Sequence, residues 1–136
     1  MCERVSSSEG IVYRDGTFTA FGLADRPGWV LYATDRHGDW AWGMTEDEAS
    51  GYGPFLRRMT AAVKAATGAT HVYYLGLGEN SLHFHGLLVA RCEPFAKDIQ
   101  AAMAERGAAV ADEAEARRLA DAIREHLATG RAEEGT

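Results

Sequence analysis

The stretch that decides the fold is Leu82-His83-Phe84-His85-Gly86-Leu87-Leu88-Val89-Ala90-Arg91, an apolar run that holds two histidines two residues apart. Apolar runs of this length, bounded by turn residues, are typical of β-strands. Because side chains alternate between the two faces of a strand, both imidazoles are expected on one face, and Leu87 should follow them there. The pair His83 and His85 is therefore the first candidate site.

Two neutral imidazoles side by side support two kinds of chemistry. One ring can attack phosphorus as a nucleophile while its neighbour orients it or handles a proton. Alternatively, both rings can bind a metal ion, which would need a third ligand, and the nearby sequence offers only Glu79 and Glu93. Histidine is also tolerated at half-buried strand positions without any function, so the spacing alone leaves structural, catalytic and metal-binding interpretations open.

The residues upstream of this run predict a hairpin and a third strand. Residues 11–14 and 17–21 are rich in β-branched and aromatic residues, and they flank Asp15-Gly16, a sequence typical of a two-residue turn. Pro27-Gly28 then predicts a turn that leads into a strand over residues 29–33.

A long helix is expected next. Thr45 and Glu48 have the spacing of a capping box, and Gly68 stands where a helix commonly ends. Pro54 lies inside this segment and predicts a kink or a restart of the helix. Residues 71–77 and 82–90 follow as a central antiparallel pair of strands, and an apolar stripe from Ala111 onward predicts a C-terminal helix.

The length and composition fit one α+β domain over residues 1–136, with a core over about 10–128 and a flexible tail from 130 to 136. The net charge of −6 disfavours a nucleic acid polymer as partner, because the chain lacks a broad positive field. No apolar run is long enough to span a membrane, and the first residues lack the apolar core of a signal peptide. The expected location is the cytoplasm. Cys2 and Cys92 make no recognisable metal or disulfide pattern.

With these elements in order, residues 10–91 resemble the histidine-triad (HIT) superfamily, whose signature alternates three histidines with apolar residues. Residues 73–91 follow that shape, and Pro27-Gly28-Trp29-Val30-Leu31 resembles the family's Pro-Gly-His strand. Asp35-Arg36-His37 resembles its Lys-Arg-His loop, and 44–48 resembles its helix start. The resemblance implies an antiparallel sheet of about five strands, with one long helix after the third strand and a C-terminal helix.

Carried over residue by residue, the resemblance assigns roles within the pair. With Arg91 fixing the register, His85 matches the family's nucleophilic histidine, His83 matches the orienting one, and Leu87 replaces the third. A shifted register would put Ser81 first and the histidines second and third. Asn80, Ser81 and Arg91 match positions that would contact substrate phosphate, although Asn and Ser are also common turn residues.

The function implied by this resemblance is a nucleotide hydrolase, phosphoramidase or nucleotidyl transferase that needs no metal or other cofactor. Leu87 leaves open a catalytically weak nucleotide-binding or regulatory protein, and the histidine pair leaves open a metal-dependent enzyme. The expected partners are a nucleotide or another phosphorylated small molecule, and a second copy of the chain. Such a homodimer would pair through Tyr73-Tyr74 and the helix over residues 55–66.

The tryptophans and the remaining histidines are given structural roles or none. Trp40 and Trp42 could stack on a base, but a role in covering the core or the surface is the simpler expectation. His37 is interpreted as a structural loop residue, while His71 and His126 receive no role.

Overall fold

The structure of the chain, a computed structural model, describes residues 10–24, 26–77, 82–91 and 112–134. Five strands form one antiparallel sheet in the order β1-β2-β3-β5-β4. The elements, in chain order, are β1 (Ile11–Arg14), β2 (Phe18–Gly22), β3 (Trp29–Thr34), the short 3₁₀ helix η1 (Ala41–Gly43), α2 (Glu46–Thr67), β4 (Val72–Leu77), β5 (His85–Ala90) and α4 (Glu113–Glu134). The predicted α+β class, the five strands and the two helices are confirmed.

The hairpin between β1 and β2 is present, but its turn lies one residue later than predicted. Asp15 donates its amide to the carbonyl of Phe18 at 3.2 Å, so Gly16 and Thr17 are the central residues. Gly16 takes a φ of +89°, which favours glycine. The Asp15 carboxylate accepts the amides of Thr17 and Phe18 at 2.8 Å each, and these bonds fix the turn.

Helix α2 has the predicted ends. The Thr45 hydroxyl accepts the amide of Glu48 at 3.1 Å, and the Glu48 carboxylate accepts the amide of Thr45 at 2.8 Å, which completes the capping box. Gly68 closes the helix with a φ of +70°. The helix continues through Pro54 without the predicted restart.

The prediction for the two strands around the histidines needs correction in two respects. β4 lies at the edge of the sheet, so of these two strands only β5 is an interior strand. β5 also begins at His85 rather than at residue 82. The reason is that Phe84 donates its amide to the carbonyl of Gly38 at 2.5 Å, a bond that ties the residues before His85 to a loop instead of a neighbouring strand.

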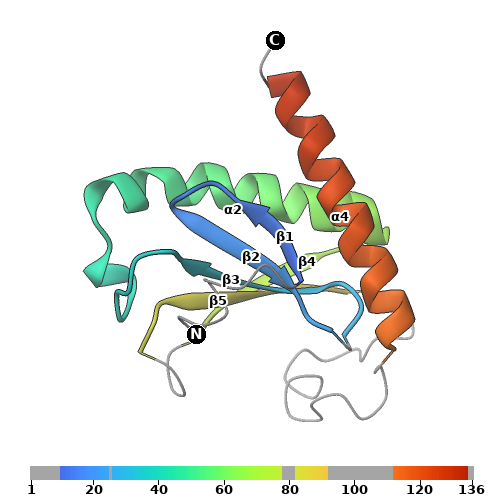
Figure 1. The fold of residues 1–136 in the computed structure, drawn as a ribbon, viewed down its shortest axis with the longest axis horizontal. Coiled ribbons are helices and arrows are strands. Elements are labelled where there is room, and N and C mark those ends of the chain that lie inside the picture. The colour runs from blue at the N-terminus through green and yellow to red at the C-terminus, as the bar shows by residue number, and fades with distance from the viewer. Residues whose placement is uncertain (1–9, 25, 78–81, 92–111, 135–136) are drawn as a thin grey trace.

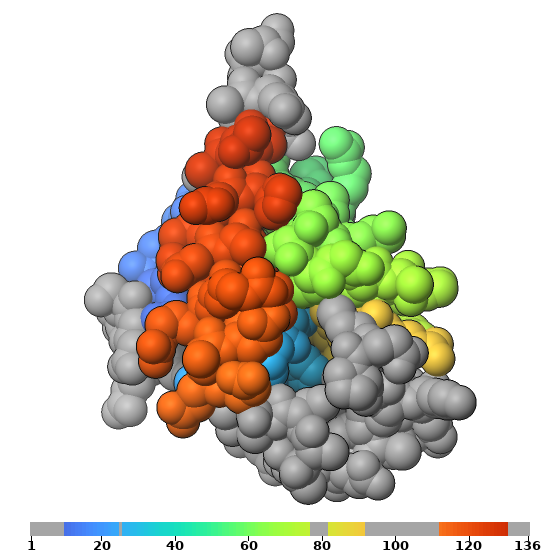
Figure 2. Space-filling view, turned by 90° about the vertical axis from the view of Figure 1, so that its right-hand side faces the viewer, coloured from blue at the N-terminus to red at the C-terminus, as the bar shows by residue number. Residues whose placement is uncertain are grey.

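Both helices cover the same face of the sheet (Figure 1), which gives a two-layer architecture. α4 buries Ala116, Leu119, Ile123 and Leu127, as its apolar stripe predicts, and the helix continues past Gly130. Figure 2 shows α4 lying beside α2 on this side of the molecule. Its Arg124 also donates to the carbonyl of Ile11, on the edge strand β1.

One close packing contact fixes β5 against β3 on the helix-covered face. Gly86 lies opposite Tyr32 in the strand register, and a Cβ at Gly86 would stand 2.3 Å from the Tyr32 hydroxyl. Tyr32 is 1% exposed and its hydroxyl shares a hydrogen bond with that of Tyr52. Burial, and then this hydrogen bond, raise the pKa of Tyr32, so the phenol stays neutral. Only glycine fits between His85 and Leu87.

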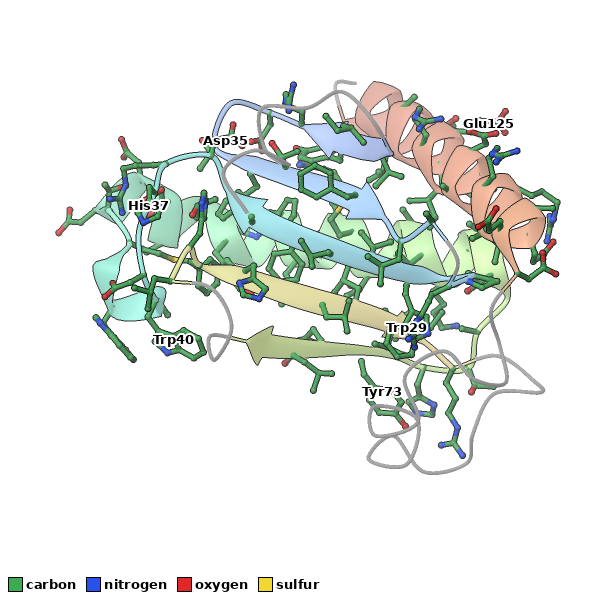
Figure 3. The ribbon with its side chains drawn as sticks, turned by 60° about the horizontal axis from the view of Figure 1, so that its bottom comes forward. Trp29, Asp35, His37, Trp40, Tyr73 and Glu125 are labelled. Atoms are coloured by element: carbon green, nitrogen blue, oxygen red, sulfur yellow. The ribbon has the colours of Figure 1, made fainter. Side chains whose placement is uncertain are left out.

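The other face of the sheet, turned toward the viewer in Figure 3, carries neither of the two described helices. We call it the open face; it bears His85, Leu87 and Val89 of β5 together with Trp29 and Leu31 of β3. Within the described residues, no helix is both long enough and apolar enough to cross a membrane.

Candidate active site

His85 opens β5 on the open face and is 7% exposed. Its Nδ1 lies 2.8 Å from the backbone carbonyl of His83. Because a carbonyl only accepts hydrogen bonds, we assign the proton to Nδ1 of His85. In the neutral ring, Nε2 then carries the lone pair and is the nucleophilic atom. The directly opposite residue on β3 is Ala33, whose small side chain does not crowd the ring.

His83 is buried, at 2% exposure, and lies before the strand rather than in it. Its Nε2 is hydrogen-bonded to the backbone carbonyl of Thr34, so by the same reasoning that nitrogen carries a proton. Its ring also meets the ring of His37 edge to face, with the centroids 5.1 Å apart. The two histidines are therefore linked by a hydrogen bond from the His85 ring to the His83 backbone carbonyl. The His83 ring itself contacts Thr34, at the end of β3, and His37, in the loop that follows.

Residues 34–38, from the last residue of β3 into the loop that follows it, contact His83 and Phe84. The Thr34 carbonyl accepts from the His83 ring, and the Gly38 carbonyl accepts the amide of Phe84. The Thr34 hydroxyl in turn donates to the carbonyl of Arg36 at 2.9 Å. Asp35 and His37 lie at the same end of the sheet as the start of β5 (Figure 3). This segment thus contacts the ring of His83 and the backbone of the next residue, Phe84.

Arg36 connects this loop to the start of α2. Its Nε and Nη2 donate to one carboxylate oxygen of Glu48, at 3.1 and 2.9 Å, and Nη2 also donates to the carbonyl of Gly43. Glu48 is only 5% exposed. Burial of this carboxyl raises its pKa, but the hydrogen bonds from Arg36 and Thr45 outweigh burial and hold the pKa of Glu48 below its usual 4.5. Glu48 is therefore ionised at neutral pH.

Leu87, the residue at the family's third histidine position, lies in an apolar cluster. It is 5% exposed and packs with Trp29 and Val89 on the open face. Leu31, Tyr73 and Leu75 pack against the same cluster. This position therefore supplies packing and has no hydrogen-bonding group to offer a ligand.

The structure places Arg91, one of the predicted phosphate-contacting residues, far from His85. Arg91 follows the other end of β5, about 20 Å along the strand from His85 at the usual rise per residue. Its guanidinium donates to the Tyr73 hydroxyl at 3.3 Å. Asn80 and Ser81, also predicted to contact substrate, lie outside the described residues.

The backbone amides that follow His85 in β5 are committed to the sheet. Residues 86–88 are paired with β3 on one side and β4 on the other. Their N–H groups therefore bond to neighbouring strands and are not available to hold phosphoryl oxygens.

Aromatic side chains lie beside the start of β5. Trp40 meets Phe84 edge to face at 6.5 Å, and Trp42 packs at 5.6 Å from Trp40. Trp42 is 79% exposed and therefore lies on the surface. Within the described part of the chain, no three His, Cys, Asp or Glu side chains gather as a metal site would need.

Sequence reasoning missed the roles of His37, Arg36 and Glu48 around the pair. The resemblance of residues 35–37 to a family loop was visible, and so was the capping box that includes Glu48. Neither signal indicates that the loop contacts His83, since that contact joins residues nearly fifty positions apart.

Comparison with known proteins supports the fold. No protein-family model matches the chain, and no curated protein matches it. A solved structure titled as a hypothetical histidine triad nucleotide-binding protein from Sulfolobus tokodaii is similar, with a TM-score of 0.70, 16% identity, and coverage of 94% of this chain and 91% of that one.

Two further solved structures extend this likeness. A zinc-bound histidine triad family protein from Mycobacterium smegmatis has a TM-score of 0.71 at 15% identity, over 96% of this chain and 94% of that one. A uridylyltransferase has a TM-score of 0.63 at 22% identity, and the match covers 91% of this chain but 44% of the larger protein. The fold of this chain is HIT-like.

Proposed function

We propose that the protein processes nucleotides or similar phosphorylated small molecules, with His85 as a nucleophile that attacks phosphorus. The observation that carries this proposal is the 2.8 Å hydrogen bond from His85 Nδ1 to the His83 carbonyl. It selects the tautomer with a lone pair on Nε2, as a nucleophilic imidazole requires. The similarity in fold to a nucleotide-binding protein and to a uridylyltransferase is consistent with this chemistry.

The reaction would proceed in two displacement steps. Nε2 of His85 forms a bond to phosphorus while the bond from phosphorus to the leaving oxygen or nitrogen breaks, and the leaving group departs with that electron pair. Water, or an acceptor hydroxyl, then attacks phosphorus and loses a proton, the bond to Nε2 breaks, and the imidazole is regenerated. In the intermediate the imidazolium keeps its Nδ1 proton, which remains hydrogen-bonded to the His83 carbonyl.

His83 has a positioning role in this proposal. Its backbone carbonyl holds His85, and its own ring is held by Thr34 and adjoins His37. The phosphoryl oxygens need donors from outside residues 86–88, and we assign that role to Asn80 and Ser81. Arg91, if it takes part, would contact a distant portion of an extended substrate.

Direct assay of turnover tests the proposal. Chelator-treated protein is incubated with an adenosine 5′-phosphoramidate and, separately, with a dinucleoside polyphosphate, and the products are followed by phosphorus NMR. His85→Ala is expected to abolish turnover, whereas His126→Ala, on the exposed surface of α4, should leave it unchanged. Quenching in acid-free denaturant and intact mass measurement should reveal a phosphorus-containing adduct that is absent from His85→Ala.

The alternatives give different outcomes in the same assay. Leu87 in its apolar cluster favours, as a second candidate, a protein that binds nucleotides with little or no turnover. Saturable nucleotide binding with no products, in wild type and His85→Ala alike, would establish that candidate in place of catalysis. Turnover that disappears on chelation and returns with a divalent metal would instead establish the metal-dependent enzyme.

The proposal includes a homodimer formed along β4. Among the described residues β4 pairs only with β5 and forms an edge of the sheet, and its Tyr74 is 62% exposed. Tyr73, by contrast, packs against the Leu87 cluster, and Phe55 of the predicted helix surface is buried. Sedimentation equilibrium should give a dimer for wild type and a monomer for Tyr74→Glu. A wild-type monomer at high micromolar concentration would reject this part.

A further inference from the structure

The described residues contain one ion pair next to the candidate site whose place the proposed chemistry does not explain. Arg36 and Glu48 are joined by two hydrogen bonds, and the Glu48 side chain is 7% exposed while that of Arg36 is 47% exposed. Ordinary surface ion pairs contribute little to stability. This pair differs from them because its acid is buried and lies in the first turn of α2, whose cap it completes.

The pair is connected to His85 by an unbroken series of contacts. Glu48 binds the Arg36 guanidinium. Arg36 lies within residues 34–38, the segment that contacts His83. The Thr34 carbonyl accepts from the His83 ring, and the Gly38 carbonyl accepts from the amide of Phe84, the residue after His83. The His83 carbonyl, placed in this way, accepts from Nδ1 of His85.

Arg36 also bonds within its own loop, which fixes the loop at both ends. Its Nη2 donates to the carbonyl of Gly43, at the end of η1, while the Thr34 hydroxyl holds the Arg36 carbonyl. A Cβ on Gly38 would stand 3.0 Å from Nη2, so the guanidinium lies against the loop backbone at that point. The Arg36 guanidinium is thus held between Glu48, the Gly43 carbonyl and the backbone at Gly38.

We propose that Arg36, anchored by Glu48, is a positioning residue for the nucleophile: it fixes the loop of residues 34–38 on His83 and thereby the tautomer and orientation of His85. The inference rests on the proposed function for its kinetic consequence, but its structural consequence can be measured without any substrate. A nucleophile held about 1 Å from its productive place loses on the order of 100-fold in rate.

The first experiment reads the imidazoles directly. Protein labelled with ¹⁵N in histidine is studied by long-range proton–nitrogen NMR at pH 7.5, in wild type and Arg36→Ala. Wild type should show His85 as a single tautomer protonated at Nδ1. Arg36→Ala should shift the His85 and His83 nitrogens toward the averaged values of mixed tautomers. Arg118→Ala is the matched control, because it breaks another arginine–glutamate pair, with an N–O distance of 2.5 Å against 2.9 Å for Arg36 and Glu48, on helix α4.

The second experiment uses turnover, where wild type has it. Arg36→Ala is expected to lower kcat by about 10- to 100-fold with KM changed less than about threefold, because substrate contacts remain while the nucleophile is displaced. Arg36→Lys keeps the charge but not the planar pair of donors, and should recover part of kcat. Unchanged imidazole spectra in a folded Arg36→Ala protein would overturn the inference, whatever the kinetics.

Two milder variants keep the test decisive if Arg36→Ala fails to fold. Gly38→Ala crowds Nη2 of Arg36 without removing any hydrogen-bonding group, and Glu48→Gln keeps an acceptor oxygen but removes its charge. Both should shift the His85 resonances in the same direction as Arg36→Ala, by smaller amounts. Wild-type spectra in both variants would reject the positioning role. A wild-type protein without turnover would reject the proposed function alone, since the spectra still test the role of Arg36.

Discussion

The open face of the sheet has two unlike ends, and β5 runs through both. At one end His85 and His83 are held by hydrogen bonds to backbone carbonyls, beside the loop of Asp35 and His37. At the other end Leu87 and Val89 pack against Trp29 in an apolar cluster (Figure 3). The start of β5 therefore carries a side chain oriented by hydrogen bonds, whereas the side chains farther along the strand only pack against their neighbours.

The difference shows how two adjacent positions on one face come to serve different purposes. The polar end needs hydrogen-bond acceptors that are not already used in pairing between strands. The end of β3 and the loop after it supply them, through the carbonyls of Thr34 and Gly38. Among the described residues, the side chains that pack around Leu87 are apolar or aromatic, so burying a polar side chain there would cost free energy. The neighbours of Leu87 thus account for leucine at this place.

The largest expected effect lies at the polar end. His85→Ala should lower turnover by at least about 1000-fold, because no other group can form the bond to phosphorus. The free energy of unfolding should fall by only about 1–2 kcal/mol, since one hydrogen bond and a ring at the end of a strand are lost. Phosphorus NMR and urea unfolding measure the two. Residual turnover within tenfold of wild type would remove His85 from the role of nucleophile.

The next effect lies at the apolar end and has the opposite character. Leu87→Ala should reduce the free energy of unfolding by about 2–4 kcal/mol, because it leaves a cavity beside Trp29 and Val89. The kcat of the folded protein should stay within a few-fold of wild type. A large loss of kcat with unchanged stability would mean that the two ends are not separate in function.

A smaller effect concerns the carboxylate that anchors the polar end. The folded pKa of Glu48 is lowered, so its contribution to stability is complete above its unfolded pKa of about 4.5 and is lost as pH falls through the folded value. Glu48→Gln should cost about 1 kcal/mol at pH 7 and progressively less below pH 4.5. Urea unfolding of both proteins between pH 7 and pH 3 measures this. A difference that grows toward acid would contradict the sign.

The smallest effect is expected for the exposed indole near the polar end. Trp42 is 79% exposed, so Trp42→Ala should change the free energy of unfolding by less than about 0.5 kcal/mol. Trp29→Ala is the matched comparison, because Trp29 is 5% exposed and its loss should cost about 3–5 kcal/mol. Thermal or urea unfolding of the two variants compares them. Equal losses would show that Trp42 is buried in solution.

Much of this protein could be predicted from its residues because the signals are local. Alternating apolar positions, Asp-Gly and the capping box of Thr45 and Glu48 each act within a few residues, and the order of elements identified a HIT-like α+β fold. Both histidines are buried, but only His85 lies in the strand, whereas their spacing predicts both of them there. The start of β5 at His85 was not foreseen, because the bond from Phe84 to Gly38 joins segments far apart in the chain.

The sequence by itself determined the class of fold, the ends of α2 and the identity of the histidine pair, since periodicity and capping depend on neighbouring residues. Only the tertiary structure decided which atoms of that pair face which partners: the Thr34 carbonyl on His83, the His37 ring beside it, and the Arg36–Glu48 pair behind the loop. These contacts depend on the register between β3 and β5 and on where α2 begins. Register and packing are properties of the folded chain, and no short stretch of residues encodes them.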